Sequence, residues 1–170
     1  ELGILGSGNN NEFLIHTGVS ALKIDRTGAV TKPAQPAFSV EKSATQDNIS
    51  NSGYDNITFD TEIFDQNADF ASNTFTAPVT GKYHLTLNVR IDNVDTGATY
   101  YNIGIQTSNR FYAQLFSPTY PSDPPYLNWM MTVVADMDAN DTAYCRIFQN
   151  GGTSQTDINT TTRYMGYLLG

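Results

Sequence analysis

The sequence is short of cysteine, of charge and of long apolar runs, and each shortage excludes a class of protein. Its 170 residues contain one cysteine, Cys145, so an intrachain disulfide cannot stabilise the fold. Only 15% of the residues are charged, and the net charge of -8 comes without any cluster of Lys or Arg. This distribution argues against binding to nucleic acid or to an anionic membrane surface. No apolar run approaches the ~20 residues of a membrane span, so we also expect no membrane insertion.

Helical periodicity is lacking as well, and the two-residue alternation of β-strands takes its place. The clearest strand is predicted over 82–91, where apolar and polar residues alternate without interruption. Similar runs, separated by clusters of Gly, Pro, Asn and Asp, bring the total to about eight strands. We therefore predict an all-β fold, an antiparallel jelly-roll β-sandwich. Two runs, "YMGYLL" and "WMMTVV", are apolar on both faces, and a second apolar face predicts a subunit interface.

The chain divides at two prolines. Residues 1–36 are short apolar bursts between Gly- and Asn-rich turns, and they end at Pro33 and Pro36. Strands this short cannot bury a core alone, so they need partner chains or a larger body to pack against. Residues 37–170 carry the longer strands and form the expected head. Because the chain begins inside a Gly/Asn-rich phrase, we expect it to be part of a longer protein.

Several motifs in residues 37–170 occur together in one family. Phe75, Ala77, Pro78, Gly81 and Tyr83 follow the pattern F-x-A-P-x-x-G-x-Y. The phrase "AFS" precedes this pattern, and "RYMGYLLG" closes the chain. In this order the motifs resemble the globular head of the C1q family, which shares a trimeric jelly roll with the tumour necrosis factor superfamily.

The preceding segment resembles something else. The phrase "ALKIDRTGAVTKP", residues 21–33, is similar to the repeat phrases that end the trimeric shafts of bacteriophage fibres. Together the two resemblances imply the tip of a viral fibre on the virion surface, joined to the rest of the fibre through its N-terminus. Two alternatives stay open. One is a purely structural trimerisation cap of a fibre, and the other is a secreted, extracellular C1q-like recognition protein.

The C1q resemblance implies a homotrimer, and composition favours one too. An extracellular chain of this size without disulfides needs stabilisation from elsewhere, and oligomerisation is the usual source. The residues that we expect near the threefold axis are aromatic or apolar and lie in strands: Phe38, Tyr101, Phe148, Tyr164, Tyr167 and Leu169.

The loop 117–126, "SPTYPSDPPY", is the candidate for binding a host-surface receptor or glycan. Its prolines stiffen it, which lowers the ordering cost of binding. Tyr120 and Tyr126 can stack on a sugar or peptide, and Asp123 can accept hydrogen bonds from hydroxyl groups. The other interpretation is a rigid connection across one end of the sandwich.

The sequence carries no catalytic motif that we recognise, so we predict that the protein is not an enzyme. It lacks the G-x-S-x-G phrase, and its two histidines do not have the spacing of metal ligands. The acidic turn "DMDAND" lacks the Gly and Glu that an EF-hand loop requires. A looser calcium site on Asp136, Asp138 and Asp141 stays open beside a plain solvated turn, and no other cofactor is expected.

Overall fold

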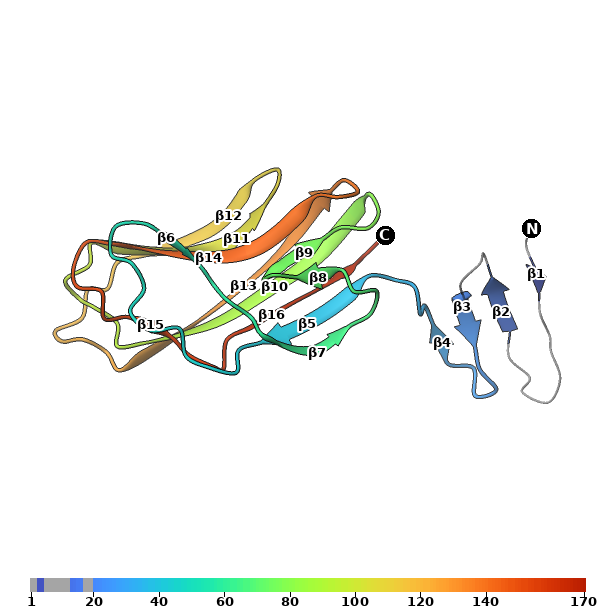
Figure 1. The fold of residues 1–170 in the computed structure, drawn as a ribbon, viewed down its shortest axis with the longest axis horizontal. Coiled ribbons are helices and arrows are strands. Elements are labelled where there is room, and N and C mark those ends of the chain that lie inside the picture. The colour runs from blue at the N-terminus through green and yellow to red at the C-terminus, as the bar shows by residue number, and fades with distance from the viewer. Residues whose placement is uncertain (1–2, 5–12, 17–19) are drawn as a thin grey trace.

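The computed structural model describes residues 3–4, 13–16 and 20–170, and this part of the chain consists of strands and loops (Figure 1). The predicted all-β class is confirmed over these residues. None of them forms a helix long and apolar enough to cross a membrane.

The head contains two sheets that pack face to face, and each strand pair in them is antiparallel. Sheet 1 has the order β13 (Tyr126–Met137), β10 (Gly81–Asp92), β16 (Arg163–Leu168), β5 (Ala37–Glu41) and β7 (Thr61–Asp65), with β15 (Asp157–Ile158) paired to β10. Sheet 2 has the order β12 (Phe111–Phe116), β11 (Tyr100–Thr107), β14 (Thr142–Asn150), β9 (Thr74–Thr76) and β8 (Phe70–Ala71), with β6 (Tyr54–Asn56) paired to β14. The long strands lie within a few residues of their predicted positions because their alternation is unbroken.

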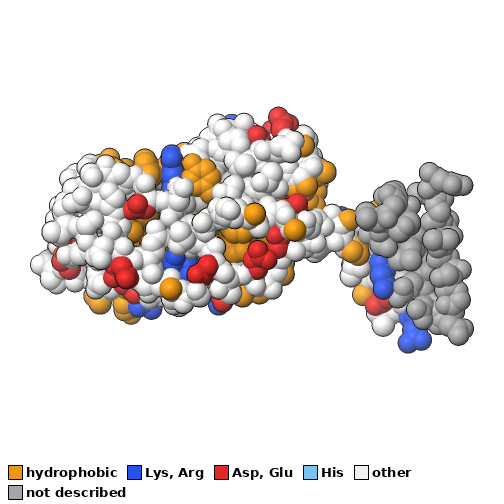
Figure 2. Space-filling model, in the orientation of Figure 1, with side chains coloured by type: hydrophobic (Ala, Val, Ile, Leu, Met, Phe, Trp, Pro, Cys, Tyr) orange, Lys and Arg blue, Asp and Glu red, His pale blue; other side chains and the backbone are white. Residues whose placement is uncertain are grey.

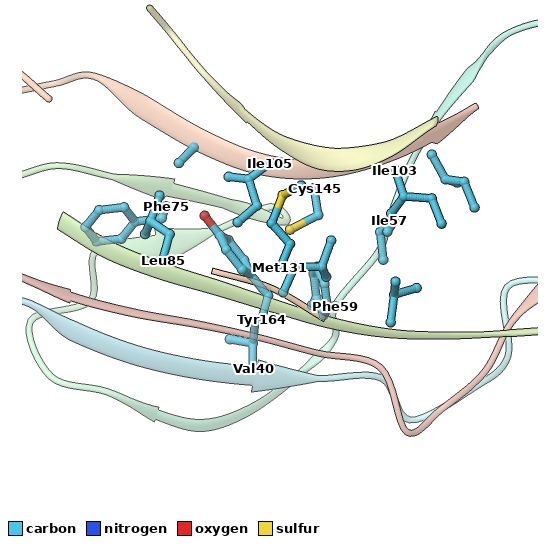
Figure 3. Close-up of a cluster of buried hydrophobic side chains, with 14 of the residues drawn as sticks. Val40, Ile57, Phe59, Phe75, Leu85, Ile103, Ile105, Met131, Cys145 and Tyr164 are labelled. Atoms are coloured by element: carbon cyan, nitrogen blue, oxygen red, sulfur yellow. The ribbon is translucent and has the colours of Figure 1, made fainter. Parts of the chain in front are cut away.

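The core lies between the two sheets and follows from the alternation in β10. The apolar side chains of this strand, from Tyr83 to Ile91, are at most 1% exposed, whereas the residues between them face outward. Figure 3 shows Leu85 of β10 facing Ile105 and Cys145 of sheet 2, with Tyr164 of β16 beside it. Each fully buried Leu or Ile side chain stabilises the fold by about 1.5–3 kcal/mol.

The motif around Tyr83 closes one end of this core. The ring of Tyr83 lies 5.4 Å from that of Phe75, and its hydroxyl donates a hydrogen bond of 2.7 Å to the carbonyl of Val79. Ala77 is fully buried, and its backbone carbonyl accepts a hydrogen bond of 2.7 Å from the backbone amide of Asn140, in the turn after β13. The motif thus fixes both the start of β10 and the turn that joins β13 to β14.

Three residues expected near a threefold axis belong to this core instead. Phe38, Tyr101 and Tyr164 are each at most 1% exposed within one chain. Phe38 stacks on Phe75 at 4.8 Å, and Tyr164 packs edge-on against Phe38 at 5.0 Å. Because these side chains point between the sheets of one chain, their place near a threefold axis stays a prediction that this burial does not favour.

A small separate sheet precedes the head. It has the order β1 (Gly3–Ile4), β2 (Phe13–His16), β3 (Ser20–Ile24) and β4 (Val30–Thr31), and it projects from one end of the sandwich (Figure 1). Among the described residues it shares no strand pair with the head. The connection is held by side-chain amides, since Gln66 donates to the carbonyls of Lys32 and Pro33. The division into residues 1–36 and 37–170 stays a prediction that this arrangement favours.

Gly166 of β16 offers a test of how tightly the core is packed. An alanine methyl group there would lie 2.6 Å from Leu85 and 2.8 Å from the ring of Phe38. We predict that Gly166→Ala lowers the free energy of unfolding by about 1–3 kcal/mol through overpacking. Urea denaturation at matched protein concentration measures this change. Gly53→Ala is the control, because its methyl group would meet only Ser50 at 3.6 Å. Equal stability of the two variants would contradict the packing described.

Candidate functional site

The outward side of sheet 1 is an exposed face with an apolar centre, and we call it the sheet-1 face. Its side chains come from neighbouring strands in register, so that Val134, His84 and Tyr167 form one row. The rings of His84 and Tyr167 are 4.9 Å apart. A hollow of about 270 Å³ lies here, lined among others by Phe64, Met165 and Tyr167. Large apolar groups exposed together in this way mark an interaction surface.

A second exposed apolar surface lies where the edge strands β12 and β13 meet, and we call it the edge patch. Leu115 is 60% exposed and Met130 is 69% exposed, and both line a hollow of about 520 Å³ with Gln114, Asn128 and Trp129. The Trp129 indole donates a hydrogen bond to the side-chain oxygen of Gln114, which ties the two edges together.

The edge patch is rigid because Trp129 belongs to a row of stacked rings that reaches the core. Trp129 stacks on Phe116 with ring centroids 4.3 Å apart, and Phe116 stacks on the buried Tyr101 at 5.0 Å. Aromatic stacking of this kind adds about 0.5–1.5 kcal/mol beyond area burial. Leu115 and Met130 are therefore presented on a stiff support.

The proline-rich loop lies at the end of the head opposite the N-terminal sheet (Figure 1). Tyr120 is 46% exposed and Tyr126 is 52% exposed, so both stay available as binding candidates. The Arg90 guanidinium lies 4.7 Å from the centroid of the Tyr126 ring and pairs with Asp92 at 2.7 Å. One side of the Tyr126 ring is therefore already in contact with a cation.

Asp123, a receptor-binding candidate, uses its carboxylate for hydrogen bonds to neighbouring loops. One carboxylate oxygen accepts from the Thr96 amide at 2.9 Å and from its hydroxyl, and the other accepts from the Gln155 amide group at 2.9 Å. These hydrogen bonds, above all those from Thr96, hold the pKa of Asp123 below its ordinary value. We therefore assign Asp123 to positioning its loop against two neighbouring loops.

The remaining interface candidates do not come together. Tyr167 lies on the sheet-1 face, as expected of an interface residue. Phe148 points outward from sheet 2, where it packs on Tyr54 at 5.1 Å. Leu169 lines a hollow at the end of the head next to the N-terminal sheet. Met130 and Val134 were missed, although the run "WMMTVV" is apolar on both faces and contains them.

The carboxylates of the acidic turn 136–141 do not converge on one point. Asp136 pairs with Lys82 at 3.7 Å, whereas a carboxylate oxygen of Asp141 accepts from Asn109 at 2.7 Å and from the Asp138 amide at 2.9 Å. Across the described part of the chain, no three His, Cys, Asp or Glu side chains are grouped as a metal ion requires. This arrangement does not favour the calcium alternative for Asp136, Asp138 and Asp141.

The family is decided by residues 37–169, over which the chain matches the C1q domain. The protein belongs to the C1q family. A search by sequence among curated proteins found no match. The C1q assignment agrees with the sandwich described above and with the position of the F-x-A-P-x-x-G-x-Y motif at the start of β10.

Solved structures show the same fold at low sequence identity. The globular domain of zebrafish complement 1qA is 19% identical, with a TM-score of 0.55 over 80% of this chain and 98% of that one. Murine APRIL is 11% identical, with a TM-score of 0.57 over 79% of this chain and 99% of that one. These likenesses support the C1q-like and tumour-necrosis-factor-like jelly roll.

The state of Asp123 gives a prediction about pH. Because its pKa is lowered in the folded protein, its hydrogen bonds persist above the ordinary value of about 3.9 and are lost as the pH falls through the lowered value. We expect the NMR signal of the Thr96 amide to titrate with a midpoint below that ordinary value. Asp123→Asn removes this titration and serves as the control. A midpoint at or above the ordinary value would contradict the assignment.

Cys145 gives a second prediction. Its side chain is fully buried in the core, and burial raises the pKa of its thiol well above the usual range. The thiolate is the reactive form, so we expect no alkylation by iodoacetamide at pH 8 until urea unfolds the chain. Rapid alkylation of the native protein, followed by mass spectrometry, would show that the core opens or that the thiol is accessible.

Proposed function

We propose that the protein is a homotrimeric, non-enzymatic recognition head that acts outside cells. The observation that carries the proposal is the pair of exposed apolar surfaces, the sheet-1 face and the edge patch, at two places on one C1q-type chain. C1q-like and tumour-necrosis-factor-like domains form trimers and act in recognition, which supports the same conclusion.

The two surfaces favour a ring of chains. When unlike surfaces of identical chains pack together, the contact is head-to-tail, and it closes only if the rotation between chains allows a ring. The edge patch of each chain would pack on the sheet-1 face of the next, and three copies would satisfy every surface. Trp129 and Met130 would then be covered by the neighbouring chain together with Tyr167.

The distal loops are the proposed receptor-binding surface. The loop 117–126 presents Tyr120 and Tyr126 at the end of the head farthest from the N-terminal sheet (Figure 1). Its anchor, Asp123, keeps it in one conformation, which lowers the entropy lost on binding. A trimer presents three such loops on one side, so that weak single sites gain avidity.

Three kinds of protein are candidates to contain this head. The family match and the solved structures favour a secreted C1q-like recognition protein over the tip of a viral fibre. The viral interpretation rests on residues 21–33 and on the small sheet β1–β4, which projects from the head as a shaft end would. A structural cap would share the trimer but would need no receptor.

Matched charge variants test the trimer. Met130→Glu places a carboxylate in the edge patch, and Tyr167→Glu places one on the sheet-1 face. We expect light scattering to give about 56 kDa for the unmodified protein, three times the 18.7 kDa of one chain, and 18.7 kDa for each variant. Mixing the two variants leaves one intact contact, and we expect a heterodimer of about 37 kDa, twice the chain mass. Tyr120→Glu, in the distal loop, is the control and should remain a trimer.

Two results would overturn this arrangement. One is a monomeric unmodified protein. The other is a mixture of the two variants that shows no heterodimer, because a head-to-tail contact must be rescued by combining an intact edge with an intact face.

Binding experiments test recognition itself. The trimer is applied to a glycan array and to intact bacterial and animal cells. A double variant with Tyr120→Ala and Tyr126→Ala is compared with the unmodified protein at the same oligomeric state. We expect saturable binding that the double variant reduces by tenfold or more, since avidity multiplies the loss at each site. A trimer that binds none of these surfaces would favour the structural cap.

A further inference from the structure

The outward side of sheet 2 holds an arginine among aromatic rings. The Arg146 guanidinium of β14 lies 4.1 Å from the centroid of the Tyr54 ring and 4.2 Å from that of Phe111. These two rings meet edge to face at 5.6 Å, and Phe148 packs on Tyr54 at 5.1 Å. Tyr100 extends the cluster, with its ring 5.8 Å from Phe148. We call these five residues the Arg146 cluster.

Arg146 has no anionic partner in the described part of the chain. Its Nε is buried without a hydrogen-bond acceptor, whereas its two terminal nitrogens are not among the buried unpaired atoms. Two other arginines on strands have carboxylate partners, since Arg90 pairs with Asp92 at 2.7 Å and Arg163 with Glu41 at 3.2 Å. Acidic side chains are scattered over the visible face of the head (Figure 2), and the chain carries a net charge of -8. Among the three arginines that lie on described strands, Arg146 is the one without a carboxylate partner.

The strand register explains why this arginine is held still. Arg146 lies opposite Gly104 of β11, where the backbone of Tyr112 and Ala113 in β12 occupies the place that a side chain would take. On its other side it lies opposite Asn56 of β6, so Tyr54 is next to it on the same face. Rings on two sides fix the plane of the guanidinium and leave its terminal nitrogens toward solvent.

A polar group beside the cluster is also incompletely paired. Asn102 of β11 lies opposite Phe148, and its amide nitrogen donates to the Tyr54 hydroxyl at 3.1 Å. The amide oxygen of Asn102 is buried without a donor. The cluster and Asn102 therefore combine a preorganised cation, ring faces that reach solvent and an acceptor whose hydrogen bond is missing.

We infer that the Arg146 cluster binds an acidic sugar, a glycan residue that carries a carboxylate. A guanidinium binds a carboxylate through two parallel hydrogen bonds, and its terminal nitrogens are the donors that this requires. The exposed ring of Tyr54 offers a flat apolar surface to the C–H groups of a sugar ring. A nucleic acid would also supply anions and stacking groups, but the net charge of -8 opposes it. The site uses neither the trimer contacts nor loop 117–126, so it can fail or succeed independently of the proposed function.

The test uses two acidic oligosaccharides with matched neutral forms. Trigalacturonate is compared with its methyl ester, and sialyllactose with lactose, by isothermal titration calorimetry on the intact protein. We expect saturable binding of at least one acidic sugar and affinity about tenfold weaker or worse for its neutral form, because a charge-assisted pair is lost. Equal affinity for the acidic and neutral forms, or binding of neither acidic sugar, would overturn the inference.

Variants then locate the binding site. Arg146→Met keeps the stem between the rings and removes the charge, so we expect binding to fall about tenfold or more. Arg146→Lys keeps the charge without the two-pronged geometry, and we expect an intermediate loss. The control is Arg110→Met, which removes a charge from an exposed arginine that lies over Tyr112 at 5.8 Å. If Arg146→Met does not fold, the lysine variant and the comparison of acid with methyl ester still decide whether Arg146 binds the carboxylate. Unchanged binding in both Arg146 variants would place the sugar elsewhere and contradict the proposal.

Discussion

The two-residue alternation of β10 is the constraint on which both the core and the proposed interface depend. This strand pairs with β13 on one side and β16 on the other, and its inward side chains fill the centre of the sandwich. Its outward side chains, His84 and Thr86 among them, form the middle of the sheet-1 face. A shift of register by one residue would exchange the two sets, so burial of the core also determines what the outer face presents.

This dependence explains what could be predicted from the sequence. The long strands and the all-β sandwich follow from local periodicity, and the motif from Phe75 to Tyr83 indicates the C1q-type jelly roll before any contact is known. The choice of interface residues does not follow from periodicity in the same way. Whether Phe38 or Tyr164 points inward depends on how one sheet stacks on the other, and periodicity within one strand does not contain that information. The opposite face of β13, with Met130 and Val134, was available from the same alternation.

The loops and the Arg146 cluster show a second limit of sequence reasoning. Asp123 is held by Thr96 and Gln155, each about thirty positions away along the chain. Arg146 meets Tyr54 and Phe111, which belong to strands β6 and β12. Such groups come together only through the topology of sheet 2. Rigid exposed aromatic residues beside stable strands are nevertheless what a recognition protein requires, and the head presents them at its distal end and on sheet 2.

Assembly joins these features, since the proposed trimer would cover the edge patch and the sheet-1 face of each chain. The most direct measurement is the mass of the unmodified protein by sedimentation equilibrium, over a range of concentrations and without crosslinking. The account predicts a single species of about 56 kDa, three times the mass of one chain, with no detectable dissociation at micromolar concentration. A stable species of 18.7 kDa would contradict it, because both apolar surfaces would then face water in the native state.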